Sequence, residues 1–274
     1  MMQALLFAVI YAKMIKHKQG RHCIIQSWQT ELVLQTILCK GDIVVDFGAG
    51  KGRFFEELAA PDKGNIAREI QYYAYDPSPK DAECCKAVMN RNGSDAANYF
   101  NDVQPLLGKV EGRVDYVLLV NVLHEIDPVN WPDIFKLVQR FLKEEGKLII
   151  VEREELTVGE APYDNGFLML MEKGAAKLFG EKDSVPKRHP KKSYIIKYEI
   201  PKSGLAITEM KVFQCIGEIQ KSALEKIDSL KHESEKKDDH SRYQAGIQLA
   251  FYLHQYANAS LCLPNLKKRW SVIL

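Results

Sequence analysis

The chain has 274 residues, enough for one large α/β domain with additional helices or for two small domains. Hydrophobic residues make up 46% and charged residues 27% of the sequence, which excludes wholesale disorder and predicts an ordinary globular protein. The 38 basic and 36 acidic side chains leave a formal net charge of +2, so the strong positive field of a dedicated nucleic-acid binder is absent.

The apolar run over 4–12 is far shorter than the roughly 20 residues that span a bilayer. A signal peptide places positive charge before its apolar run, whereas Lys13, Lys16 and Lys18 follow this one. We therefore expect a packed helix here, within an N-terminal helical extension over 1–40, and neither a leader nor a membrane association.

From residue 41 onward, short apolar runs alternate with longer helical patterns, which is typical of successive βαβ units and a parallel sheet. The runs are almost continuously apolar, as expected of strands covered by helices on both faces. The predicted strands are 43–47, 71–76, 114–120 and 147–152. The predicted helices are 52–60, 80–90, 128–143 and 166–179.

The next segment, 194–200, alternates large apolar and charged residues, and a Pro-Lys-Ser-Gly turn joins it to 205–213. This pattern predicts an antiparallel hairpin at the end of the sheet. The sequence is helical in pattern from 214 to 274, interrupted by a charged run over 231–239 that we expect to be a solvated loop. The prediction is a Rossmann-like α/β domain over 41–213 with a mixed sheet, followed by a C-terminal helical extension.

Two stretches of this domain have open interpretations. The insertion over 153–192 carries polar and apolar side chains that could form an acceptor pocket or lid, or a helix that packs on the sheet. Within it, the basic cluster over 187–192 could bind an acidic acceptor, although a solvated loop is the favoured interpretation.

The six cysteines are scattered and contain no CxxC pair. Their spacing indicates neither a zinc site nor a disulfide framework, and no metal site is expected. Reduced thiols fit a cytoplasmic protein. The cysteines are Cys23, Cys39, Cys84, Cys85, Cys215 and Cys262.

A glycine-rich turn follows the first predicted strand, which ends at Asp46. Glycine lets the backbone approach a ligand without a Cβ in the way, and the turn opens the following helix at the sheet edge where α/β proteins bind ligands. The dinucleotide fingerprint GxGxxG requires Gly or Ala where Arg53 stands, which disfavours a nicotinamide cofactor. The carboxylate of Asp46 instead suits a positively charged sulfonium cofactor. The alternative to a cofactor-binding loop is that the glycines only form a tight turn between the strand and the helix.

Two further acidic segments follow at the ends of later elements. Asp76 comes at the end of the second strand, about 20 residues beyond the glycines, where a carboxylate can accept hydrogen bonds from ribose hydroxyls. The run from Tyr99 to Asp102 combines ring faces with an amide and a carboxylate, which suits packing against adenine and bonding to its amino group.

In this order, Asp46, the glycine turn, Asp76, Asp102 and Asn121 resemble the motifs of class I S-adenosylmethionine-dependent methyltransferases over about 41–213. The resemblance implies that S-adenosylmethionine is the cofactor, with its methionine part against the glycine loop, its ribose on Asp76 and its adenine by Asp102. It also implies a third strand just before Tyr99, where no clear apolar run occurs. The expected cofactor-binding residues are Asp46, Gly48, Ala49, Gly50, Gly52, Asp76, Pro77, Asn101, Asp102 and Asn121.

The fourth strand leads into His124 and Glu125, at the edge nearest the transferable methyl group. Histidine can take a proton near neutral pH, so His124 is the candidate general base, with Glu125 or Asp127 orienting it. This segment partly resembles small-molecule O-methyltransferases, which typically carry His-Asp-Trp where this chain has His124, Glu125 and Ile126. A structural or cofactor-lining histidine is the alternative.

The resemblance implies methyl transfer to an acceptor that the sequence does not name, with a small molecule favoured and nucleic acid or protein left open. Asn121 is followed by Val122 rather than by the Pro-Pro-aromatic motif of DNA amino-methylating enzymes, and the Pro-Cys motif of cytosine carbon-5 enzymes is missing. The alternative function is a catalytically silent S-adenosylmethionine sensor or interaction subunit, because fold alone does not specify activity. The pattern makes no prediction of oligomeric state.

Overall fold

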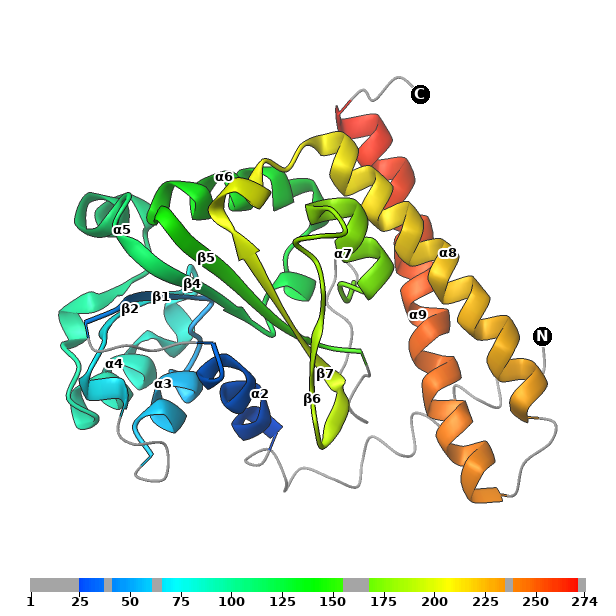
Figure 1. The fold of residues 1–274 in the computed structure, drawn as a ribbon, viewed down its shortest axis with the longest axis horizontal. Coiled ribbons are helices and arrows are strands. Elements are labelled where there is room, and N and C mark those ends of the chain that lie inside the picture. Colours follow the sequence, from blue (N-terminus) through cyan, green and yellow to red (C-terminus); the bar gives the residue numbers. More distant parts are fainter. Residues whose placement is uncertain (1–24, 37–40, 61–65, 155–167, 235–238, 271–274) are drawn as a thin grey trace.

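The computed structural model describes residues 25–36, 41–60, 66–154, 168–234 and 239–270. These residues form a seven-stranded sheet in the order β3-β2-β1-β4-β5-β7-β6, covered by helices on both faces, with a long helical pair along one side (Figure 1). The predicted α/β fold with a mixed sheet is confirmed. The apolar run over 4–12 lies outside the described residues.

The parallel part of the sheet contains the four strands that the sequence predicts, and a short additional one. β1 lies between β2 and β4, and every one of its residues is buried because helices cover both faces. The parallel strands are β1 (Ile43–Phe47), β2 (Gln71–Tyr75), β3 (Tyr99–Phe100), β4 (Val114–Val120) and β5 (Leu142–Arg153). β3 is only two residues long, which explains why no apolar run precedes Tyr99.

The antiparallel edge of the sheet differs from the predicted hairpin. β7 (Lys192–Pro201) pairs antiparallel with β5 and with β6 (Lys187–His189), so its partner precedes it in the chain. The prediction of a strand over 205–213 is wrong: this stretch ends the turn η7 (Lys202–Leu205) and begins α8 (Glu209–Ser234). The buried side chains of this stretch and of α8 recur at helical spacing, which is why the chain forms a helix here and not a strand. They are Val212, Ile216, Ile219 and Ala223.

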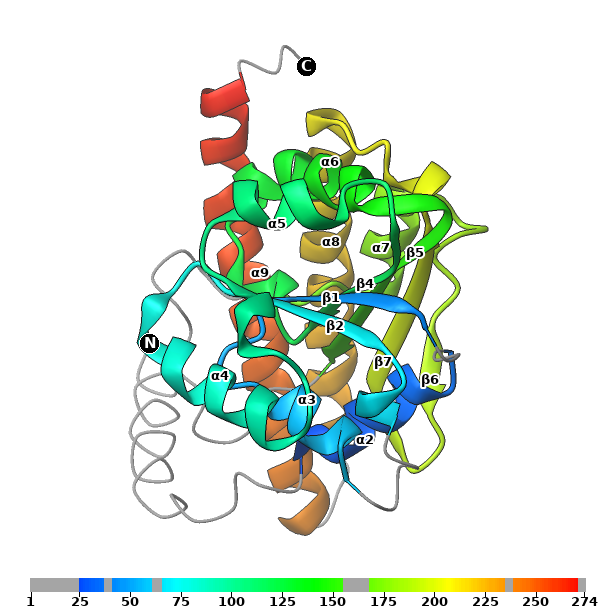
Figure 2. The ribbon, with the colours of Figure 1, turned by 90° about the vertical axis from the view of Figure 1, so that its left-hand side faces the viewer.

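Two helical layers cover the sheet, and Figure 2 shows α3 and α4 on one side of it and α5 and α6 on the other. Alternate residues of one strand enter opposite layers: Val44 packs in the layer of α2, α3 and α4, and Val45 in the layer of α5, α6 and α7. The first three helices are α2 (Ile25–Leu34), α3 (Arg53–Leu58) and α4 (Ala82–Arg91). The others are α5 (Val103–Val110), α6 (Trp131–Phe141) and α7 (Glu172–Phe179).

The C-terminal part is a pair of long helices, α8 and α9 (Asp239–Trp270), which lie along each other at one side of the molecule (Figure 1). The solvated loop predicted over 231–239 is wrong for 231–234, which continue α8, and for Asp239, which begins α9. Ala259 and Leu266 of α9 are buried in the core that also contains the α6 side of the sheet. None of the helices in the described ranges is long and apolar enough to cross a membrane.

Candidate functional site

The glycine loop connects β1 to α3 at the carboxyl edge of the sheet. Gly48, Gly50 and Gly52 all have positive φ, at 91°, 51° and 78°. A Cβ on Gly48 would lie 2.6 Å from Val122 Cγ2, whereas a Cβ on Gly50 would meet no atom within 4 Å. Gly48 is thus required by packing, and Gly50 leaves open space in which a ligand can approach the backbone.

The end of β2 holds the glycine loop in place. The Tyr75 carbonyl accepts hydrogen bonds from the amides of Gly48 and Ala49, at 2.8 and 3.0 Å. The Asp76 carboxylate accepts the Gly50 amide with Oδ2 and the Ser78 amide with Oδ1, both at 2.8 Å. A carboxylate has about four acceptor positions. Asp76 can therefore hold the loop and still accept hydrogen bonds from a ribose.

The carboxyl group of Asp46 lies beneath the loop, with a side chain only 2% exposed. The Tyr72 hydroxyl donates a 2.5 Å hydrogen bond to Asp46 Oδ2. Burial is the main cause that raises the pKa of Asp46 to about 6; the hydrogen bond from Tyr72 opposes this rise and the nearby Asp76 adds to it. The structure thus brings Asp46 close to the loop but packs its carboxyl group into the interior.

The predicted adenine-contact segment lies at the neighbouring strand end. The Asp76 amide donates to the Phe100 carbonyl at 3.0 Å, which brings the ends of β2 and β3 together. Asp102 caps α5 by accepting the Gln104 amide at 3.0 Å, and it is exposed, as are Asn101 and Pro77. These groups lie at the edge of the sheet beside Asp76, and the carboxylate among them is exposed to solvent.

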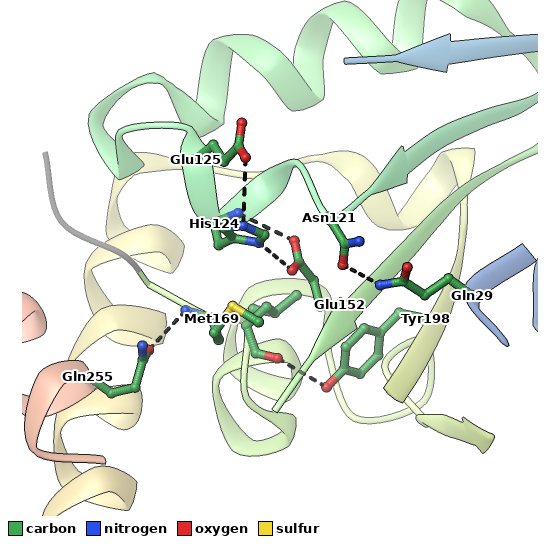
Figure 3. Close-up of polar contacts among 9 residues, drawn as sticks. Gln29, Asn121, His124, Glu125, Glu152, Met169, Tyr198 and Gln255 are labelled. Atoms are coloured by element: carbon green, nitrogen blue, oxygen red, sulfur yellow. Dashed lines mark hydrogen bonds and ion pairs between the residues drawn. The ribbon is translucent and has the colours of Figure 1, made fainter. Parts of the chain in front are cut away.

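Asn121 follows β4 and has the only positive φ of a non-glycine residue in the described ranges, 57°. Its Oδ1 accepts a 2.5 Å hydrogen bond from Nε2 of Gln29, which reaches the site from α2 (Figure 3). Gln29 is fully buried. Sequence reasoning missed it, because a single glutamine in an N-terminal helix carries no motif.

A buried histidine–carboxylate pair lies at the ends of β4 and β5. His124 Nδ1 is 2.6 Å from Glu152 Oε2, and the backbone amide of His124 donates to Glu152 Oε1 at 3.3 Å. The other ring nitrogen, Nε2, lies 4.0 Å from Glu125 Oε1 (Figure 3). Glu152 is fully buried and His124 is 8% exposed. Because a carboxylate can only accept, Glu152 places the proton on Nδ1.

Glu152 was missed as a site residue, although the sequence contained a signal for it. It directly follows the apolar run 148–151 at the end of a predicted strand, and a carboxylate at the buried end of a strand requires a partner. Val120 of β4 pairs with Val151 of β5, which places Glu152 opposite the segment that carries His124. Asp127, the alternative orienting group, instead accepts the Val129 amide at 3.0 Å.

Of the insertion over 153–192, the part from residue 168 onward contacts both the sheet and the C-terminal helices. Of the helix predicted over 166–179, residues 168–171 are not helical and α7 covers the rest of the described part. The amide of Met169 donates to Gln255 Oε1 of α9 at 2.9 Å, and the Tyr198 hydroxyl donates to the Leu170 carbonyl at 3.5 Å (Figure 3). Helix α9 thereby supports the backbone of this segment.

The basic cluster over 187–192 is not the solvated loop that the sequence favoured. It contains β6, in which Arg188 forms ion pairs with Glu154 at 2.5 Å and Glu172 at 3.2 Å. His189 is buried and lies 3.1 Å from Glu31 of α2. These ion pairs and the burial of His189 fix the cluster at the sheet edge, while the side chains of Lys187 and Arg188 stay exposed.

A family model described as a methyltransferase domain matches residues 21–187, more than half of the chain. A search of curated proteins finds no match. Phosphoethanolamine N-methyltransferase 1 from Haemonchus contortus, solved with phosphoethanolamine and S-adenosylhomocysteine, is 15% identical over 86% of this chain and 59% of its own, with a TM-score of 0.53. This likeness shows the fold.

Two other solved structures are less similar in shape. A SAM dependent methyltransferase from Aquifex aeolicus is 18% identical over 69% of this chain and 96% of its own, with a TM-score of 0.46. Geranyl diphosphate C-methyltransferase from Streptomyces coelicolor A3(2) is 20% identical over 46% of this chain and 45% of its own, with a TM-score of 0.36. The matched part of this chain thus spans about half the length of that enzyme and of the Haemonchus one.

The open space at Gly50 and the acceptor oxygens of Asp76 fit a ligand that carries a ribose and lies against the loop backbone. The family match includes this loop and the carboxyl ends of β2, β3, β4 and β5. The chain belongs to the methyltransferase-domain family, which has the class I Rossmann-like fold and uses S-adenosylmethionine as its cofactor.

Proposed function

We propose that this chain is an enzyme that transfers the methyl group of S-adenosylmethionine to a small-molecule acceptor. The observation that carries this proposal is the His124–Glu152 pair, which lies at the same edge of the sheet as the glycine loop. When bound, the cofactor supplies a methyl group that its positively charged sulfur already activates. The four free cysteines of the described residues, including Cys84 and Cys215, support a cytoplasmic location.

The glycine loop and the strand ends provide the groups that would hold the cofactor. Gly50 offers open space in which the cofactor can approach the loop backbone, and Asp76 offers carboxylate oxygens to the ribose. Asp102 and Asn101 lie at the next strand end, where the adenine amino group needs an acceptor. In this assignment Asn121 borders the site on the β4 side.

His124 acts as the general base in this proposal. Because Glu152 accepts the Nδ1 proton, Nε2 has the lone pair that can take a proton from an acceptor hydroxyl or amine as that group is methylated. The buried carboxylate of Glu152 fixes the ring orientation and stabilises the imidazolium that results. Glu125, near Nε2 and 44% exposed, can pass the proton on to solvent.

The burial of this pair supports a small acceptor. His124 is 8% exposed and Glu152 is fully buried, so the reacting atom must enter the interior to reach Nε2. A narrow molecule can do so, whereas the surface of a folded protein or a duplex cannot follow it without rearrangement. The acceptor is therefore best sought among small hydroxyl and amine compounds.

The experiment that tests the function measures S-adenosylhomocysteine formed by the purified protein from S-adenosylmethionine and panels of small hydroxyl and amine compounds. Once an acceptor is found, His124→Gln should lower kcat by roughly 10²–10⁴-fold while S-adenosylhomocysteine still binds. His254→Gln on α9 is the matched control and should retain the wild-type kcat. Tight cofactor binding with no turnover across the panels would instead support the silent sensor.

A further inference from the structure

Helix α2 carries a polar side chain into the interior of the protein beside the cofactor site. Gln29 is fully buried, and its neighbours Leu32 and Val33 pack with Val44 of β1 in the core. The buried ammonium of Lys197 donates to the Leu32 carbonyl at 2.7 Å, which fixes the end of α2 on β7. The packing of α2 on the sheet thus fixes the position of Gln29.

The amide of Gln29 has only one of its two polar atoms engaged. Its Nε2 donates to Asn121 Oδ1 at 2.5 Å, and its Oε1 is buried without a hydrogen-bond partner among the described residues. The large majority of buried side-chain polar atoms in folded proteins have a hydrogen-bond partner, because leaving one unpaired is destabilising. Oε1 is therefore an acceptor that a donor group of a ligand can pair with.

The partner of Gln29 lies next to the glycine loop. Asn121 follows β4, and the side chain of the next residue, Val122, packs directly on Gly48. The positive φ of Asn121 is a conformation that asparagine tolerates better than most residues, and such conformations often mark binding sites. The unpaired oxygen of Gln29 is thus on the β4 side of the loop.

The donors of S-adenosylmethionine are its α-ammonium, two ribose hydroxyls and the adenine amino group. Asp76 and Asp102, the carboxylates that suit the ribose and adenine, lie after β2 and β3, on the other side of β1 in the sheet. A cofactor extended along this edge would have its methionine part towards β4. The α-ammonium is then the donor left for the β4 side, and an amide oxygen attracts its positive charge.

We propose that Gln29 binds the cofactor, with its Oε1 accepting a hydrogen bond from the α-ammonium of the methionine part. This rests on the cofactor assignment above. It makes α2, from the N-terminal part of the chain, a component of the cofactor site. Asn121 acts here as a positioning residue that holds the Gln29 amide with its oxygen turned to the ligand.

The test compares two ligands by calorimetry: S-adenosylhomocysteine, and 5′-methylthioadenosine, which keeps the adenine, ribose and sulfur but lacks the amino-acid part. Gln29→Leu keeps the size of the side chain and removes the acceptor. It should weaken S-adenosylhomocysteine binding by roughly 10–100-fold, as expected for a hydrogen bond to a charged group, and leave 5′-methylthioadenosine binding within about twofold. Gln29→Glu retains an acceptor oxygen and should bind S-adenosylhomocysteine nearly as well as the wild type.

The matched control is Gln220→Leu on α8, where the same change removes a hydrogen bond to Ser260 and should affect neither ligand. Unchanged S-adenosylhomocysteine affinity in Gln29→Leu would overturn the proposal. So would an equal loss for both ligands, because that would indicate general damage to the site. If the wild-type protein binds 5′-methylthioadenosine and S-adenosylhomocysteine equally tightly, no ammonium contact exists. Failure of the wild type to bind either ligand would contradict the cofactor assignment itself.

Discussion

Replacing Gly48 with alanine perturbs the glycine loop through two separable effects. The backbone φ of 91° is costly for a residue with a Cβ, by about 1–3 kcal/mol. The added Cβ would also lie 2.6 Å from Val122 Cγ2 and 2.7 Å from its Cγ1, and such overpacking costs about 1–3 kcal/mol. We expect Gly48→Ala to lower the free energy of unfolding by about 2–6 kcal/mol, the sum of the two effects.

Gly50→Ala provides the matched control, because φ is 51° there and a Cβ would meet nothing within 4 Å. It should cost only the backbone term of about 1–2 kcal/mol. Urea unfolding, monitored by circular dichroism, gives both free energies. The variant Val122→Ala, alone and combined with Gly48→Ala, completes a double-mutant cycle. Because Val122→Ala removes the methyl groups that the new Cβ would meet, Gly48→Ala should destabilise the protein less in that background. Equal destabilisation by the two glycine replacements, or no recovery in the cycle, would refute the assigned contact.

Three other perturbations follow from the same structure. Burial raises the pKa of Asp46 from 3.8 to about 6, because the folded state favours the protonated carboxyl group. The stability that this group contributes is therefore present below pH 4 and lost as pH rises through 6. Because Asp46→Asn cannot ionise, its free energy of unfolding in urea should rise relative to that of the wild type by on the order of 3 kcal/mol between pH 4 and 7. A difference between the two proteins that does not change with pH would contradict this. Glu199→Gln leaves the buried Lys197 without its 3.0 Å carboxylate and should cost about 3 kcal/mol in thermal unfolding, whereas Glu144→Gln, on an 83% exposed side chain, should cost little. Asp76→Ala should abolish S-adenosylhomocysteine binding in calorimetry with the circular dichroism spectrum unchanged, and retained affinity would remove Asp76 from the site.

The parallel strands of the sheet could be predicted because each has its own local pattern. The apolar run of β1 has the bounds that the sequence predicted, Ile43–Phe47, and the glycines that follow it adopt the positive φ for which glycine is needed. Acidic residues that end parallel strands must meet at one edge of the sheet, so Asp76 could be placed beside the loop without coordinates.

The partners of these elements could not be predicted in the same way. The alternating pattern of β7 showed that it is a strand, but 205–213 was chosen as its partner because it follows directly in the chain. In the folded chain β6 occupies the edge next to β7, and 209–213 is helical because its apolar side chains pack against the core at helical spacing. The pairing depends on which segment fills the space at the sheet edge.

By itself, the sequence determined the α/β class, the four main parallel strands, the glycine loop and the position of His124 at a strand end, because each is written in a short stretch of chain. Only the tertiary structure brought Glu152 to His124 across β4 and β5, and Gln29 to Asn121 from α2. Those two pairs join residues 28 and 92 positions apart. Local patterns report whether a residue is buried, whereas the identity of its partner is fixed by packing between distant elements.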